Sequence, residues 1–139
     1  MTQTMTQTSS AFEAGPELLR DLERRARPID LEENRILFRQ GEAARGVYLV
    51  RKGMARLTRQ SGNEFLLVVE AGPGSLLGVP AVIGSKPYSL TAEAMEGAEL
   101  SLLPAEYFVY LMHTEPMLSF RVLKVLAEEV RFARDAFAH

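Results

Sequence analysis

Glycine and proline are concentrated in one stretch, residues 72–94, and this stretch constrains the fold more than any other. It reads GPGSLLGVPAVIGSKPYSLTAEA and contains four glycines and three prolines. Glycine tolerates left-handed backbone conformations and proline fixes φ, so backbone conformation rather than side-chain chemistry is constrained here. Backbone amides gathered in this way can form a small concavity for an anion. The stretch is therefore the first candidate for a binding site.

The composition predicts a single globular domain and excludes several kinds of site. A chain of 139 residues is long enough for one domain that buries about two-thirds of its unfolded surface. It has no cysteine, which excludes disulfides, iron–sulfur clusters and thiolate zinc sites and fits a reducing cytoplasm. No apolar run reaches the roughly 18 residues of a membrane-spanning helix, and no secretory signal is visible. We therefore expect a cytoplasmic protein with no membrane partner.

The order of periodicities predicts a strand-rich domain between helices. Residues 1–12 are expected to form a disordered tail, because this polar segment buries little apolar surface, and residues 13–139 one domain. A helix is predicted over residues 16–26. From residue 29 to residue 103 apolar residues alternate with polar ones in short segments separated by glycine turns. The pattern favours a mainly β fold with flanking α: an eight-stranded β-roll or jelly roll, with an N-terminal helix and a long C-terminal helix.

Two helices are predicted at the C-terminal end of the chain, over residues 104–113 and from residue 114 to 137. Apolar residues of the longer helix fall on two lines, which is typical of a helix with two partners. One partner is the roll, and we expect the other to be the same helix of a second subunit. The predicted dimer line contains Leu123, Leu126, Val130, Ala133 and Phe137, and the second line contains Met117, Phe120, Val125 and Phe132.

Several separated segments together resemble the cyclic-nucleotide-binding domain family, and more specifically the sensor half of catabolite-activator (Crp/Fnr-type) bacterial regulators. They occur in the family's order from an early strand and turn to the starts of the two closing helices. The segments are ILFRQGE at residues 36–42, VYLVRKG at 47–53, GPGSLLG at 72–78, PAEYF at 104–108 and EPML at 115–118. The resemblance implies the family's β-roll, and it implies that residues 72–94 contain its phosphate-binding cassette.

At two positions this cassette departs from the pattern that the resemblance implies. Val79 stands where the family has a glutamate for the ribose 2′-hydroxyl, and Tyr88 stands where it has an arginine for the cyclic phosphate. Hydrogen bonds to charged groups contribute about 1.5–3 kcal/mol each, so losing two weakens binding by about two to four decades. The candidate ligand-binding residues are Gly78, Val79, Pro80, Ala81, Lys86, Tyr88, Ser89 and Leu90.

Three hypotheses of function follow. The first is a non-catalytic sensor domain, homodimeric and open to a small-molecule effector, that does not bind cAMP or cGMP in the usual way. The second is a ligand-free homodimeric interaction module. The third is a genuine cyclic-nucleotide binder that uses backbone amides, Ser89 and Lys86. No cofactor is expected, since cAMP and cGMP are disfavoured.

Catalytic, metal-binding and nucleic-acid-binding functions are not expected. No nucleophile-elbow motif or Ser–His pair is evident, and two histidines, His113 and His139, do not form a metal cluster. A net charge of −2 gives no basic footprint for nucleic acid. The chain ends where a Crp/Fnr-type regulator would continue into its DNA-binding domain, so we expect no direct contact with DNA.

Overall fold

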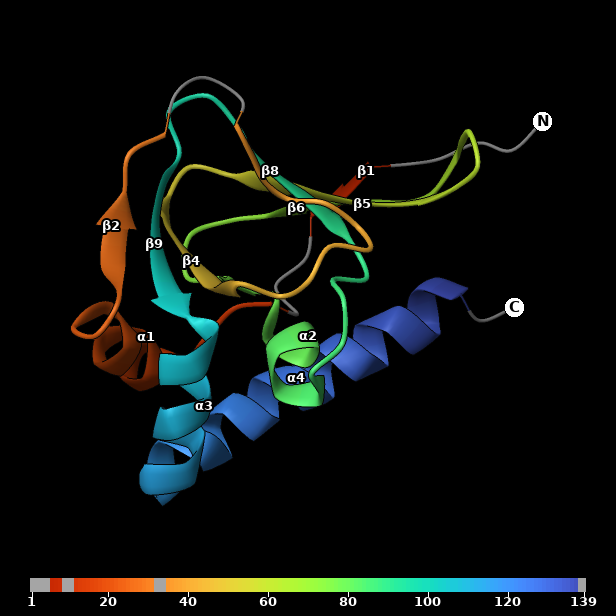
Figure 1. The fold of residues 1–139 in the computed structure, drawn as a ribbon. Helices are drawn as coiled ribbons and strands as arrows, with labels where there is room; N and C mark the ends of the chain where they lie inside the picture. The colour runs from red at the N-terminus through yellow and green to blue at the C-terminus, as the bar shows by residue number, and fades with distance from the viewer. Residues whose placement is uncertain (1–5, 9–11, 32–34, 138–139) are drawn as a thin grey trace.

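The computed structural model describes residues 6–8, 12–31 and 35–137, and within them the elements follow the predicted order (Figure 1). Strands β2 to β9 are antiparallel and form two sheets, with the orders β6-β5-β8-β3 and β2-β9-β4-β7. The predicted jelly roll is confirmed. The elements are β1 (Thr6–Thr8), α1 (Pro16–Glu23), β2 (Arg27–Ile29), β3 (Ile36–Phe38), β4 (Gly46–Lys52), β5 (Ala55–Ser61), β6 (Glu64–Ala71), β7 (Leu76–Leu77), α2 (Val79–Gly84), β8 (Thr91–Ala94), β9 (Glu99–Pro104), α3 (Ala105–Thr114) and α4 (Pro116–Phe137).

Strand β4 lies between the two hydrophobic layers of the molecule. Residues 46–50 are all buried, because successive side chains of a strand point to opposite faces and both faces are covered here. Tyr48 and Val50 belong to the cluster between the two sheets. Val47 and Leu49 belong to the cluster between the four-stranded sheet and the helices. An unbroken apolar run is what a strand covered on both faces requires.

Helix α4 runs beneath the roll and past α2, and its two faces have different environments (Figure 1). Leu118, Val122 and Val125 are buried against the helices and the four-stranded sheet. Their steps of four and three residues place them on one side of the helix. Phe120 and Leu123 lie on the outer side and are exposed.

Within residues 1–12, where we expected a disordered tail, the described residues 6–8 form a strand, and the remainder up to residue 11 lies outside the described residues. Strand β1 pairs in parallel with β6, with Thr6 opposite Val68. The side chain of Phe12 is buried and meets the ring of Phe132 edge to face, with the ring centroids 5.8 Å apart. A polar strand can pair in this way because the open edge of a sheet offers backbone hydrogen bonds whatever the side chains are.

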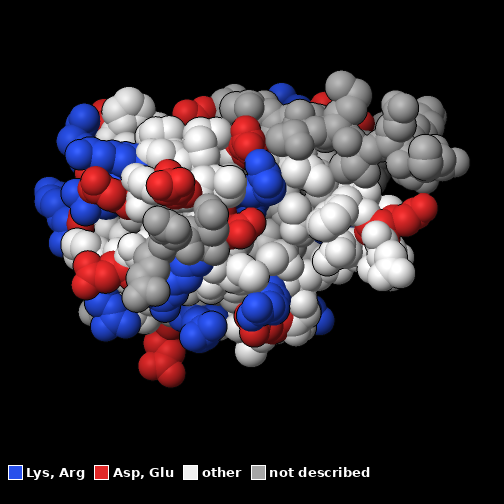
Figure 2. Space-filling model, turned by 90° about the horizontal axis from the view of Figure 1, so that it is seen from above, with Lys and Arg blue, Asp and Glu red and all other residues white. Residues whose placement is uncertain are grey.

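The surface shows charges of both signs. On the face drawn in Figure 2, Lys and Arg are interspersed with Asp and Glu rather than gathered by sign. Among the helices of the described residues, none combines the length and the hydropathy needed to cross a membrane.

Candidate functional site

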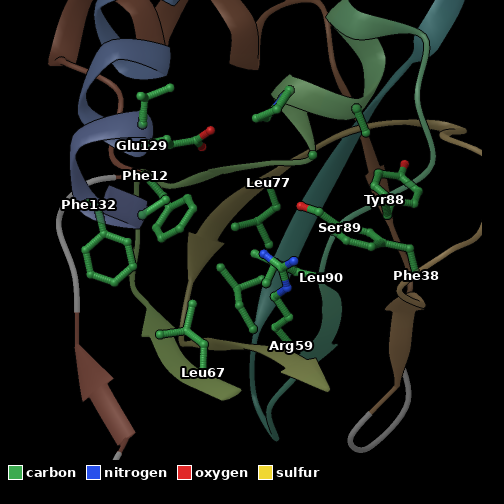
Figure 3. Close-up of a pocket in the computed structure, with 16 residues that line it drawn as sticks. Phe12, Phe38, Arg59, Leu67, Leu77, Tyr88, Ser89, Leu90, Glu129 and Phe132 are labelled. Carbon is green, nitrogen blue, oxygen red and sulfur yellow. The ribbon is translucent and has the colours of Figure 1, made fainter. Parts of the chain in front are cut away.

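A cavity of about 260 Å³ lies between the roll and helix α4 (Figure 3). Strands of both sheets, the start of α2 and the second half of α4 contribute to its wall. Most of the lining is apolar, and the polar side chains on it are few, as in pockets that bind small molecules. The lining residues are Phe12, Phe38, Leu57, Arg59, Leu67, Leu77, Gly78, Pro80, Ala81, Tyr88, Ser89, Leu90, Glu129, Val130, Phe132 and Ala133.

Gly78, which caps the start of α2, is in contact with Tyr88. Its φ of +94° lies in the left-handed region that favours glycine. A Cβ atom added there would lie 2.8 Å from Cε1 of Tyr88 and 3.2 Å from the carbonyl oxygen of Gly46. The glycine is therefore needed both for the turn into α2 and for the close approach of the tyrosine ring.

Tyr88 is buried in the wall of the roll. The residue is 2% exposed, and its ring stacks on that of Phe38 with the ring centroids 3.7 Å apart. Its hydroxyl donates a hydrogen bond to the carbonyl oxygen of Gly46 at 2.6 Å and accepts bonds from the backbone N–H groups of Gly46 and Arg45 at 3.0 and 3.1 Å. Its own backbone bonds to Glu42 and Gly41, through N–H and C=O respectively. The side chain of Tyr88, where the resemblance implied an arginine, thus binds the protein's own backbone.

The structure brings most of the predicted cassette residues together on one wall. Gly78, Pro80, Ala81, Tyr88, Ser89 and Leu90 all line the cavity. Val79 does not, because its side chain is buried in the cluster beneath the helices. Lys86 is exposed and lines a separate surface hollow beside α3. Val79, at the position where the resemblance implied a glutamate, therefore faces the core, and the cation predicted for the site, Lys86, lines a different hollow, whereas Arg59 lines the cavity.

Glu129 is the functional candidate that the sequence interpretation missed. It lies on α4, only 7% of it is exposed, and its carboxylate points toward the cavity beside Phe12 (Figure 3). The Oε1 atom has no hydrogen-bond partner among the described residues. Burial raises the pKa of Glu129 to about 8. Its position could have been found, because it continues the buried side of α4 four residues after Val125.

The predicted dimer residues do not share one environment. Leu123 and Val130 are 58% and 55% exposed. Leu126 is half-buried against the helices, and Ala133 lines the cavity. The side chain of Phe137 lies outside the described residues. A line of outward-facing residues instead runs through Phe120, Leu123, Ala127 and Val130, and each of them is exposed.

In the described part of the chain, histidine and acidic side chains do not form a metal site. His113 is exposed near the end of α3, and His139 lies outside the described residues. No group of three or more His, Cys, Asp or Glu side chains there could hold a metal ion.

A roll that keeps an apolar cavity beside its terminal helix has the form of a small-molecule-binding domain. Residues 28–115 match the family model described as the cyclic nucleotide-binding domain. The chain belongs to the cyclic nucleotide-binding domain family, and it is related to Crp/Fnr-type regulators.

Three relatives illustrate the range of proteins that carry this domain. The cyclic AMP receptor protein of Thermus thermophilus is 32% identical over 99 residues, which is 70% of this chain and 45% of that protein. The crystal structure of the catabolite activator protein of the same organism superposes with a TM-score of 0.71 at 26% identity, covering 90% of this chain and 60% of that one. Lysophospholipase nte1 of Aspergillus fumigatus is 27% identical over 117 residues, or 84% of this chain. The chain spans 8% of the length of that lysophospholipase.

Proposed function

We propose that this chain is a non-catalytic sensor domain whose effector is not a cyclic nucleotide held by its phosphate. The observation that carries the proposal is the position of Tyr88. Its hydroxyl makes three hydrogen bonds to the backbone of Arg45 and Gly46, and its ring is stacked on Phe38. A phosphate at this place would have to displace a buried, fully paired side chain, and no arginine would replace the bonds that are lost.

The cavity that remains suits an apolar effector. Its wall holds aromatic and aliphatic side chains from both sheets, including Phe38, Leu57 and Leu77. Burial of apolar surface contributes about 25 cal/mol per Å², so a small apolar molecule can bind here without charged contacts to a phosphate.

Binding of a ligand in the cavity can change the position of α4, because α4 forms part of the cavity wall. Glu129 and Phe132 line the cavity from α4, while Leu123, two turns earlier on the same helix, is exposed and does not line it. A ligand that favours one position of α4 shifts the population of that position by its difference in affinity. The proposed mechanism is therefore a change in the packing of α4 against the roll.

The partner that receives this change is proposed to be a second copy of the chain. Phe120, Leu123, Ala127 and Val130 recur at alternating steps of three and four residues, which is the spacing of a coiled-coil seam. Three of these four side chains are large, apolar and more than half exposed. Pairing of two α4 helices would bury them.

The coupling of the cavity to α4 is tested with the apolar fluorophore anilinonaphthalene sulfonate as probe. We expect its fluorescence to rise on saturable binding, and backbone amides around residues 129–133 to exchange with deuterium more slowly in its presence. Leu90→Trp, which fills the cavity from its half-buried wall, should lose both effects. Leu66→Trp, a matched change on the exposed side of β6, should retain both.

A ligand-free interaction module is the second candidate, and the exposed apolar line on α4 favours it. The same experiment separates the two candidates. If the probe binds in the cavity and leaves the exchange of α4 unchanged, the sensor mechanism is contradicted and the interaction module is supported.

A further inference from the structure

Glu129 carries a buried carboxylate oxygen, Oε1, that finds no hydrogen-bond partner among the described residues, although it lies in an apolar pocket. About nine-tenths of the residue is buried. Phe12 and Phe132 lie beside it on the wall (Figure 3). Buried carboxylates in proteins are ordinarily hydrogen-bonded or paired with a cation, because burying one alone is strongly unfavourable. The missing partner of Glu129 is therefore expected in a ligand.

The shape and chemistry of the pocket restrict what that ligand can be. Its wall is apolar apart from Glu129, Ser89 and Arg59, and Ser89 and Arg59 are exposed residues. We infer that the pocket takes a small apolar amine, whose ammonium group binds the Glu129 carboxylate while its apolar body fills the cavity. The inference rests on the proposed function and names the chemical class of its effector.

The protonation of Glu129 gives this class of ligand a distinctive pH dependence. With a pKa of about 8, the empty site is mostly protonated at neutral pH, so an ammonium group must displace a proton on binding. Amine affinity should therefore rise by up to about tenfold per pH unit below pH 8 and level off above it. The other titratable groups on the described wall are Arg59 of β5, an exposed residue whose guanidinium is drawn among the lining side chains in Figure 3, and Tyr88, which is hydrogen-bonded to the backbone.

The test compares three probes of one size and different polar ends: phenylbutylamine, phenylbutanol and phenylbutyrate. Affinities are measured by calorimetry across neutral to mildly alkaline pH on the wild type and on Glu129→Gln. Glu128→Gln is the matched control, because Glu128 is the neighbouring carboxylate on α4 and is exposed. Thermal unfolding verifies that each variant is folded, and Glu129→Leu serves if the glutamine variant is not.

We expect the amine to bind the wild type about tenfold or more tightly than the alcohol or the acid at the alkaline end. Glu129→Gln should abolish that preference and its pH dependence, and Glu128→Gln should keep both. Equal binding of the three probes, or an amine preference that survives Glu129→Gln, would overturn the inference while leaving a ligand-binding sensor intact. Binding of none of the probes would overturn the inference and count against the proposed function as well.

Discussion

At the scale of single residues, Gly78 and Tyr88 approach each other closely at the start of α2, and in the proposed function the tyrosine occupies the place of a phosphate. The 2.8 Å separation between a virtual Cβ of Gly78 and the tyrosine ring leaves room for no other residue at position 78. The tyrosine hydroxyl in turn accepts hydrogen bonds from the backbone N–H groups of Arg45 and Gly46 at the start of β4. Both residues are therefore held by packing and hydrogen bonds within the roll.

Glu129 makes the stability of the ligand-free protein depend on pH. Its pKa is about 8 in the folded state and 4.5 as the reference, so the folded state binds more protons than the unfolded state between these values. The free energy of unfolding therefore falls as pH rises from about 4.5 to about 8, by several kcal/mol at most. Glu129→Gln should remove this slope and be more stable than the wild type at pH 8. Urea denaturation across this range measures it, and an unchanged slope in the variant would refute the assignment.

The chemistry of these residues could be predicted from the sequence only in part. The resemblance to the family implied a glutamate and an arginine at the two positions where the sequence has Val79 and Tyr88. That Val79 faces the core and that Tyr88 bonds to Gly46, 42 residues earlier, depends on tertiary packing. No local pattern encodes such a distant contact.

At the scale of elements, α4 connects the cavity to the outer surface of the molecule. Its buried side runs from Leu118 to Glu129, and it is tied to α1 by Arg121, which pairs with Glu17 at 2.7 Å and Asp21 at 3.3 Å. Its outer side carries the exposed apolar line. One helix therefore contacts both the proposed effector and the proposed partner.

The dimer seam is tested by Leu123→Glu. Leu123 is 58% exposed, so a charge there leaves the domain folded but lies in the middle of the proposed seam. We expect the wild type to be a dimer by light scattering and this variant a folded monomer, because an unpaired charge at a seam disfavours association. Tyr110→Glu, which places the same charge on an exposed apolar position of α3, should remain dimeric. A monomeric wild type would show that the seam is wrongly assigned.

Leu126, although predicted for this seam, is unsuitable for such a test because it packs against the domain's own helices. The helix and its two apolar sides could be predicted from the sequence, but some residues were assigned to the wrong side. Val125 and Leu126 are adjacent and both apolar, so periodicity alone does not show which of the two side chains faces the roll. Strands β1 and β7 were missed for a related reason: they are only three and two residues long, and their pairing is set by neighbours far along the chain.

At the scale of the whole molecule, the jelly roll of the family is present, and a ligand site with different chemistry is what we propose. The order of strands, turns and closing helices could be predicted because glycine turns and alternating apolar residues are local signals. The cavity could not, because its wall combines residues from Phe12 to Ala133 that only the closed roll brings together. The family model over residues 28–115 assigns the family, and the class of effector that we propose rests on Tyr88 and Glu129.

Calorimetric titration of the wild-type chain with cAMP and cGMP tests the central claim most directly. With Tyr88 bound to the backbone of Arg45 and Gly46 and no arginine at its position, both nucleotides should bind more weakly than about 10 μM. The reason is the loss of two charged contacts, which removes about two to four decades of affinity. Saturable binding of either nucleotide tighter than about 10 μM would contradict the account.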